Sequence, residues 1–193
     1  LTVNSKNKKV QNKAVEFVTP LASGVTPDAA ITSMLAPYNT ALTAVFDGQI
    51  GVATNLFVRG GNIERRQEVP LGNLVTDAIR LRYGPQLAPT NGGGFRQPIP
   101  SNYLPADHTL RRTQIGYAAG PPFDVVIGDS FAVLPFGNSV VTRNVTGAQL
   151  YAALENGVSQ ILPDGTGVDG RFPQISGFKF TFHYLNPVGS RVT

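Results

Sequence analysis

Hydrophobic residues recur at helical spacing in three segments of the chain, 26–48, 70–84 and 146–158. The first opens with Thr26 followed by a proline and an aspartate, which suits a hydroxyl N-cap, a proline at the first helical position and an acid in the first turn. The second opens at Pro70 and closes on a glycine, and the third follows a capping threonine. These segments predict three helices.

Shorter apolar runs lie between and after these segments and predict strands. They occur at 50–58, 87–90 and 123–127, and at 175–184, where Phe178, Phe180 and Phe182 alternate with polar residues. A further apolar run at 133–145 is broken by Pro135-Phe136-Gly137-Asn138, and residues 97–122 are rich in proline, as in a long surface loop. Because strands and helices interleave, the chain is expected to be α/β or α+β, a single mixed-sheet domain with flanking helices.

The first 25 residues differ from the rest of the chain. Val15, Phe17 and Val18 alternate around a glutamate and predict a strand, and small turn-forming residues at 20–24 predict a linker. We therefore expect the domain to occupy residues 26–193, preceded by the end of another piece of structure in residues 1–25.

Composition narrows the possible chemistry. The 193 residues include 41% hydrophobic residues but no cysteine, which excludes disulfide frameworks, thiolate zinc sites and cysteine nucleophiles. The net charge of +4 is spread out except for four lysines within residues 6–13, which we interpret as a solvated edge, so no nucleic-acid partner is expected. No apolar run approaches the roughly 20 residues that span a bilayer.

A glycine triplet is the first candidate site. Residues 92–94 follow a short apolar run and precede Arg96. Glycines let the backbone approach a ligand and leave N–H groups pointing outward, and an adjacent guanidinium would complete a phosphate pocket. A plain tight turn is the alternative. The spacing fits neither a Walker A loop nor a dinucleotide fingerprint.

Three further arginines, Arg59, Arg65 and Arg66, precede the second predicted helix, whose N-terminal end carries positive partial charge. One or two of them would project toward the same anion. The alternative is ion pairing with Glu64 or Glu68.

Phe136 lies between a proline and a glycine, an awkward position for a core aromatic. A phenylalanine held in a loop offers a flat face on which a base can stack, and packing into the core is the alternative. The sequence contains no His-Glu-x-x-His motif, no Gly-x-Ser-x-Gly elbow and only two histidines, which are too few for a mixed His and Asp di-metal centre.

Four blocks in this order resemble the C-terminal domain of the 5'-nucleotidase family, which includes UDP-sugar hydrolases and cyclic phosphodiesterases. They are Glu-Val-Pro-Leu-Gly-Asn-Leu-Val-Thr-Asp-Ala at 68–78, Thr-Asn-Gly-Gly-Gly-Phe-Arg at 90–96, Leu-Pro-Phe-Gly-Asn at 134–138 and Gly-Arg-Phe-Pro-Gln-Ile-Ser-Gly at 170–177. The similarity covers about residues 26–193. It implies the fold of that domain, incomplete at its C-terminal end.

The resemblance also implies roles for individual residues. Two arginines would bind phosphate, one phenylalanine would form one jaw of an aromatic clamp on the base, two asparagines would contact the base or nucleoside, and one glycine would bring backbone close to it. In this order they are Arg65, Arg96, Phe136, Asn91, Asn138 and Gly170.

In that family a metallophosphoesterase domain with two divalent metal ions performs the hydrolysis, and its metal-binding blocks are absent from these residues. The resemblance therefore implies a substrate-recognition domain that binds no cofactor and has no catalytic residue in this segment. Its partners would be a nucleotide or related phosphoester and the catalytic domain, whose end and linker residues 1–25 would represent. The second aromatic jaw and an acidic base contact would follow Thr193.

The resemblance further implies a periplasmic or extracellular protein without a membrane span. Two alternatives remain open. One is a non-catalytic nucleotide-binding or cell-surface interaction module of the same fold. The other is a hydrolase of nucleotide sugars, cyclic nucleotides or other phosphoesters, because Arg96 and Phe136 do not discriminate among these substrates.

Overall fold

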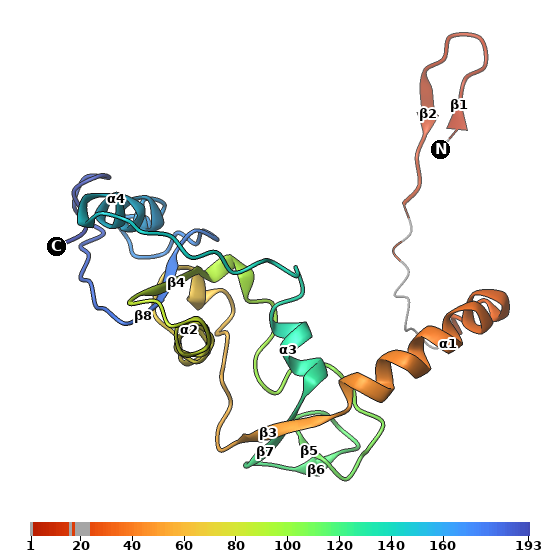
Figure 1. Cartoon of the computed structure of the whole chain (residues 1–193). Helices are drawn as coiled ribbons and strands as arrows, with labels where there is room; N and C mark the ends of the chain where they lie inside the picture. The colour runs from red at the N-terminus through yellow and green to blue at the C-terminus, as the bar shows by residue number, and fades with distance from the viewer. Residues whose placement is uncertain (1, 16, 18–23) are drawn as a thin grey trace. The chain divides into compact units, whose positions relative to one another are not determined.

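A computed structural model describes residues 2–15, 17 and 24–193, and the chain divides into two units, Leu1–Thr40 and Ala41–Thr193 (Figure 1). In the first unit, β1 (Thr2–Val3) and β2 (Val10–Asn12) form a short antiparallel hairpin. Most of the strand and linker predicted within residues 15–24 lies outside the described residues.

The first predicted helix is present as α1 (Ala29–Phe46), but it begins two residues later than expected. The carboxylate of Asp28 accepts hydrogen bonds from the N–H groups of Ala30, at 2.9 Å, and Ile31, at 3.0 Å. Asp28 is therefore the N-cap instead of Thr26, because its charged oxygen meets free N–H groups at the positive end of the helix.

The other predicted helices are confirmed as α2 (Pro70–Tyr83) and α4 (Gly147–Val158). Pro70 opens α2, and Gly84 ends it in the left-handed conformation, with φ of 69°, while its N–H bonds to the Arg80 carbonyl. Thr146 caps α4 in a reciprocal pair with Gln149 at its third position.

One helix was not predicted. α3 (Ile127–Val133) is seven residues long and begins where the β-branched run of β7 (Phe123–Val126) ends. Two helical turns are too short to show a 3.6-residue period, and the apolar residues at both ends of the segment favour a strand in the sequence.

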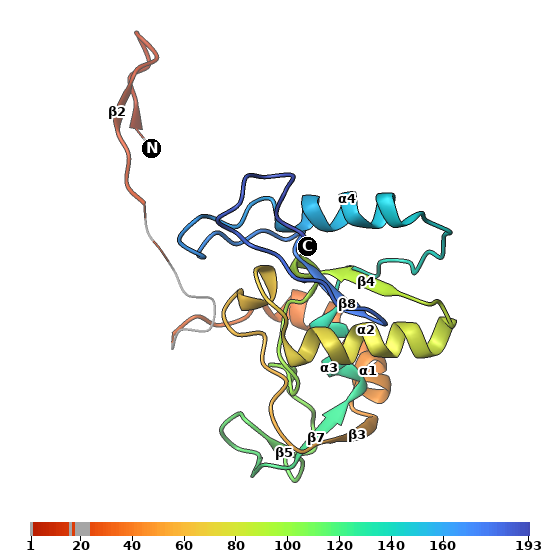
Figure 2. The same cartoon turned by 90° about the vertical axis from the view of Figure 1, so that its left-hand side faces the viewer.

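The strands pair two by two. β3 (Gln49–Ala53) runs antiparallel to β7, and β4 (Ala88–Asn91) runs antiparallel to β8 (Pro173–Ser176). In Figure 2 the β4–β8 pair lies between α2 and α4, which gives a layered mixture of helix and sheet and confirms the predicted class. The core forms two clusters, one around Leu71 and Phe95, the other around Leu154, Val158 and Phe172.

Two predicted strands are longer than the observed ones. β3 ends at Ala53 rather than at residue 58, and β8 ends at Ser176 rather than at residue 184. Beyond β8, Phe178, Phe180 and Phe182 are half-buried and pack on the second core cluster, while the residues between them are exposed. The alternation therefore reports burial correctly, although only an isolated bridge from Phe182 to Val192 pairs this segment.

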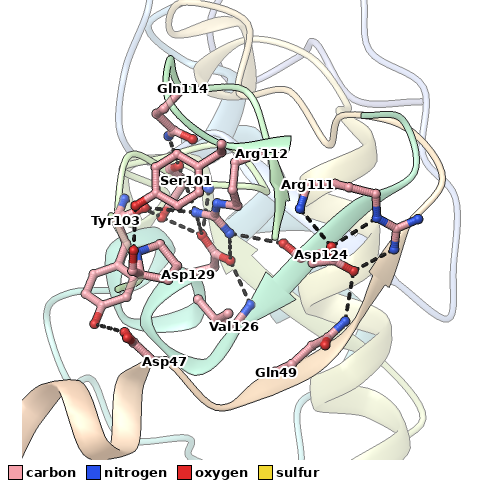
Figure 3. Close-up of polar contacts among 12 residues, drawn as sticks. Asp47, Gln49, Ser101, Tyr103, Arg111, Arg112, Gln114, Asp124, Val126 and Asp129 are labelled. Carbon is pink, nitrogen blue, oxygen red and sulfur yellow. Dashed lines mark hydrogen bonds and ion pairs between the residues drawn. The ribbon is translucent and has the colours of Figure 1, made fainter. Parts of the chain in front are cut away.

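The predicted loop 97–122 is held by a network of polar side chains and contains the short parallel pair β5 (Arg111–Arg112) and β6 (Ala118–Ala119) (Figure 3). Arg112 and Asp129 are both fully buried and form a two-point ion pair with N–O distances of 2.7 and 2.8 Å. Asp129 also accepts hydrogen bonds from the N–H groups of Ser101 and Val126. The loop is thus fixed to the start of α3, the helix that leads toward Phe136.

A second carboxylate in the network, that of Asp124, makes the stability of the unit Ala41–Thr193 depend on pH. Arg111 donates to Asp124 at 2.6 and 3.0 Å, and this hydrogen bonding lowers the pKa of Asp124 to about 2. Because this pKa is lower than the ordinary value of roughly 3.9, the ionised carboxylate stabilises the folded state when the pH is above about 3.9, and this contribution is lost as the pH falls toward 2.

The free energy of unfolding, measured by urea titration, should decrease between pH 4 and pH 2. Asp124→Asn should flatten that part of the profile, and an unchanged slope would contradict the assignment.

Candidate functional site

The glycine triplet forms η2 (Gly92–Gly94), a 3₁₀ turn at the end of β4. The N–H of Gly92 donates to the Phe172 carbonyl at 2.8 Å, and the N–H of Gly93 donates to the Gly170 carbonyl at 2.9 Å. The prediction that these N–H groups point outward to a ligand is therefore wrong for both residues, since the neighbouring backbone already accepts from them.

Close backbone packing explains why glycines stand here. A Cβ on Gly92 would lie 2.0 Å from the Glu64 carbonyl oxygen, and one on Gly93 would lie 2.7 Å from the Cα of Gly170. Three segments far apart in sequence thus meet backbone to backbone: η1 (Ile63–Arg65), η2 and the turn before β8.

This junction brings together three of the predicted site residues. The side-chain amide of Asn91 donates to the Gly170 carbonyl at 3.1 Å, and the N–H of Asp169 donates to the Arg65 carbonyl at 3.3 Å. Arg65 Nη1 lies 3.8 Å from the position that a Cβ on Gly170 would occupy. The guanidinium of Arg65, the amide of Asn91 and the half-buried backbone at Gly170 therefore lie close together.

The buried carboxylate of Glu64 holds two of the arginines. It accepts from Arg59 Nε at 2.7 Å and lies 3.6 Å from Arg65 Nε. The alternative interpretation, ion pairing with Glu64, is thus confirmed for both arginines, although the acid is fully buried. Within the described part of the chain, the terminal nitrogens of Arg65 make no hydrogen bond, so they stay available to an anion.

The remaining arginine outside this pairing, Arg66, donates to the Gly165 carbonyl at 3.3 Å, and Glu68 accepts from Asn73 instead of from an arginine. Among the described residues Arg66 thus pairs with a backbone carbonyl and with neither Glu64 nor Glu68.

Arg96 and Phe136 form the second group. The guanidinium carbon of Arg96 lies 5.5 Å from the centre of the Phe136 ring, and both residues line an open cleft of about 380 Å³. Phe136 is 55% exposed, so the alternative that it packs into the core is wrong. The guanidinium of Arg96 thus lies over an exposed aromatic ring; in general, exposed rings can stack on bases and guanidinium groups can bind phosphate.

The first core cluster and the end of α3 hold Arg96 and Phe136 in place. Phe95 is fully buried in the first core cluster, and the N–H of Arg96 donates to the Val133 carbonyl at the end of α3 at 2.9 Å. The turn that carries Arg96 is therefore tied to the helix that precedes Phe136. Asn138 lies two residues further along an exposed segment, and among the described residues its side chain makes no hydrogen bond.

Sequence reasoning missed Gln174 in β8, which is 1% exposed. Its side-chain oxygen accepts from the Val69 N–H at 3.1 Å, and its nitrogen donates to the carbonyls of Glu64, at 2.9 Å, and Gln67, at 2.8 Å. This one side chain joins β8 to η1 and the start of α2, and so sets where Arg65 lies. The glutamine stands within the quoted block 170–177, but nothing in its spacing indicates contacts more than a hundred residues away.

No three His, Cys, Asp or Glu side chains gather at a possible metal site in the described part of the chain. The described residues thus do not fit the two divalent metal ions that the resemblance assigns to a separate domain. Within the same residues, no helix has both the length and the apolar character to cross a bilayer.

The chain thus folds as a mixed α/β domain that exposes one arginine, Arg96, beside the aromatic ring of Phe136. The chain belongs to the 5'-nucleotidase family: residues 49–193 match the family's "5'-nucleotidase, C-terminal domain". It is 32% identical over 132 residues to the trifunctional nucleotide phosphoesterase protein YfkN of Bacillus subtilis, covering 66% of this chain and 7% of that protein. It is 32% identical over 168 residues to the cell wall protein Lmo0130 of Listeria monocytogenes, covering 82% of this chain and 19% of that protein.

Among solved structures, the 5'-nucleotidase precursor of Thermus thermophilus matches with a TM-score of 0.60 and 33% identity, over 84% of this chain and 27% of that one. A putative 5'-nucleotidase of Staphylococcus aureus, 17% identical with a TM-score of 0.59, shares the fold. The chain spans less than a third of the length of each of these relatives.

Proposed function

We propose that this chain is the substrate-recognition domain of a 5'-nucleotidase-like hydrolase. The base of a nucleotide stacks on Phe136, and the phosphate binds the guanidinium groups of Arg96 and Arg65. Asn91 and Asn138 contact the base or nucleoside, and the backbone at Gly170 approaches it. The observation that carries the proposal is the cleft in which Arg96 and the exposed ring of Phe136 face the same space, 5.5 Å apart.

The charge and aromatic character of this cleft suit a nucleotide. A guanidinium offers a planar fork of donors that matches phosphate, and every base has a face that stacks on an aromatic ring. Since no three His, Cys, Asp or Glu side chains gather in the described part of the chain, the proposal assigns hydrolysis to a separate di-metal domain, in the same protein or associated with it. The cell wall protein among the relatives supports a periplasmic or extracellular location.

That same relative favours a second candidate, a non-catalytic module presented at a cell surface. Such a module, whether it has kept nucleotide binding or not, would release no phosphate even in its full natural context. A complete protein with a metal-binding domain would release phosphate from AMP with Mn²⁺, and a chelator would abolish the release.

Binding of AMP to this chain, measured by isothermal titration calorimetry, tests the proposal. Phe136→Ala should weaken binding by about 1–3 kcal/mol, the usual contribution of base stacking on an aromatic ring. Arg96→Gln should weaken it by a similar amount, because it removes a charge-assisted contact to phosphate.

Phe131→Ala is the matched control, since Phe131 is also 55% exposed but does not line the cleft. It should leave the affinity unchanged. Equal affinities of the native chain and both cleft variants would refute the assignment of the site.

A further inference from the structure

Three asparagines of the unit Ala41–Thr193 precede a glycine or a serine. Asn91 and Asn156 are each followed by glycine, and Asn138 is followed by Ser139. At such pairs the backbone nitrogen of the small following residue can attack the side-chain carbonyl carbon of the asparagine, which releases ammonia and leaves a carboxylate. Because glycine has no Cβ, it hinders this attack less than serine does. The sequence alone therefore ranks both Asn–Gly pairs above Asn138.

The fold protects the first Asn–Gly pair. The N–H of Gly92 donates to the Phe172 carbonyl at 2.8 Å. The side-chain amide of Asn91 donates to the Gly170 carbonyl at 3.1 Å. Gly92 is also buried, and a Cβ there would lie 2.0 Å from the carbonyl oxygen of Glu64. Both groups that would react are thus hydrogen-bonded and closely packed, so ring closure requires this junction to open first.

The second Asn–Gly pair is protected by α4. Gly157 lies within the helix and is buried, and a Cβ there would lie 2.7 Å from the Cδ of Pro173. An N–H inside an α-helix donates to the carbonyl four residues earlier, and the helix fixes the backbone rotation that ring closure has to change. The side-chain oxygen of Asn156 also accepts from Arg171 at 3.2 Å. This pair therefore reacts only when α4 opens.

Asn138 has none of these restraints. It lies in residues 134–146, which are all exposed and form no helix or strand between α3 and α4 (Figure 1). Among the described residues, neither the side chain of Asn138 nor the N–H of Ser139 makes a hydrogen bond. The backbone can therefore rotate at little cost to bring this nitrogen to the side-chain carbonyl carbon.

We propose that Asn138 is a site of spontaneous deamidation, and that it reacts before either Asn–Gly pair while the chain is folded. The nitrogen of Ser139 loses its proton and bonds to the side-chain carbonyl carbon of Asn138. The bond from that carbon to the amide nitrogen breaks, ammonia leaves with the proton, and a cyclic imide remains. Water then opens the imide at either carbonyl and leaves an aspartate or an isoaspartate.

Incubation at mildly alkaline pH, followed by tryptic peptide mapping, tests this order. Trypsin cleaves after lysine and arginine, and so places the three asparagines in the separate peptides 83–96, 113–143 and 144–171. Deamidation replaces an amide NH₂ with OH, a mass gain of about 1 Da. Peptide 113–143 should gain this mass first, while 83–96 and 144–171 stay largely unmodified. Fragment ions distinguish Asn156 from Asn144 in the last peptide.

The same incubation in guanidinium chloride separates the effect of the fold from that of the sequence. Unfolding breaks the hydrogen bonds at Asn91 and Asn156, so both Asn–Gly pairs should then react faster than Asn138. Two results would overturn the proposal. One is a folded chain in which an Asn–Gly pair reacts first, and the other is an Asn138 that reacts in denaturant but stays intact in the folded chain.

Two variants at the next position test the role of the backbone nitrogen. Ser139→Val keeps Asn138 but places a branched side chain beside the attacking nitrogen, and it should slow the reaction. Ser139→Gly removes the side chain and should accelerate it. Position 139 is exposed and precedes two exposed valines, so both variants should unfold thermally like the native chain. Equal rates in all three chains would exclude attack by this nitrogen.

Deamidation would also alter the cleft, a consequence that rests on the proposed function. Asn138 lies two residues after Phe136, and its proposed contact to the base or nucleoside would become a carboxylate. Asn138→Asp should weaken AMP binding about threefold to tenfold, as for the loss of one hydrogen bond. Asn144→Asp adds the same charge to the same exposed segment and should leave the affinity unchanged.

The two readouts separate the possible failures. If AMP does not bind the native chain, the proposed function fails, but the order of deamidation is still decided by the peptide map. If AMP binds and the folded chain does not deamidate first at Asn138, this inference fails alone. If Asn138→Asp binds AMP as tightly as the native chain does, the modification has no effect on the cleft.

Discussion

Asp129→Asn is expected to lower the free energy of unfolding by about 3–5 kcal/mol, the usual cost of removing one partner of a buried ion pair. Asp129 and Arg112 are both 0% exposed at their side chains, and the guanidinium would keep its charge with no carboxylate to neutralise it. Burial raises the pKa of Asp129, but the hydrogen bonds from Arg112, Ser101 and Val126 lower it by more than burial raises it. The net pKa is below the ordinary value, so the carboxylate is charged at neutral pH. Urea unfolding at pH 7, followed by circular dichroism, measures the change.

Asp164→Asn is the matched control for this substitution. Asp164 is exposed, and its hydrogen bonds reach only Thr166, two residues away. The control should change stability by less than about 1 kcal/mol, as is usual for surface positions. A loss of similar size in both variants would mean that the Arg112–Asp129 pair does not hold the long loop in place.

Gln174→Leu is expected to have the second largest effect, a loss of more than about 2 kcal/mol. Leucine preserves much of the volume but leaves the Val69 N–H and the carbonyls of Glu64 and Gln67 without their partner, and each unsatisfied buried group costs about 1–3 kcal/mol. Because the lost bonds fix η1, the variant should also bind AMP more weakly through Arg65.

Gln160→Leu makes the same exchange at an exposed position after α4. Its urea unfolding midpoint should stay close to that of the native chain. If Gln174→Leu is as stable as this control and binds AMP equally well, the glutamine does not organise the site.

The helices with strong end signals were the most predictable part of the fold. α2 and α4 match their predicted ranges because Pro70, Gly84 and Thr146 act locally, within a turn of the residues that they cap. α3 was not predicted because a seven-residue helix is too short to show a 3.6-residue hydrophobic period. The N-cap of α1 is Asp28 rather than Thr26, because the Asp28 carboxylate accepts from the first free N–H groups of the helix.

The sequence names candidate site residues one by one, but it does not indicate how they are arranged in the fold. The exposed setting of Phe136 follows from its neighbours, a proline and a glycine, which act locally. The glycine triplet was misinterpreted because its N–H groups bond to Gly170 and Phe172, nearly eighty residues away. Gln174 was missed for the same reason: the groups that it holds, the carbonyls of Glu64 and Gln67 and the N–H of Val69, lie more than a hundred residues away in the sequence.

The most direct test of the central claim is an AMP titration of the ¹⁵N-labelled chain by NMR, which detects binding even when it is weak. The account predicts saturable shifts at the amides of Asn91, Arg96, Phe136 and Gly170, with β5 and β6 unperturbed, and Phe136→Ala should remove most of the response. Shifts that are absent, or that spread over the lysines of residues 6–13 instead of the cleft, would contradict it.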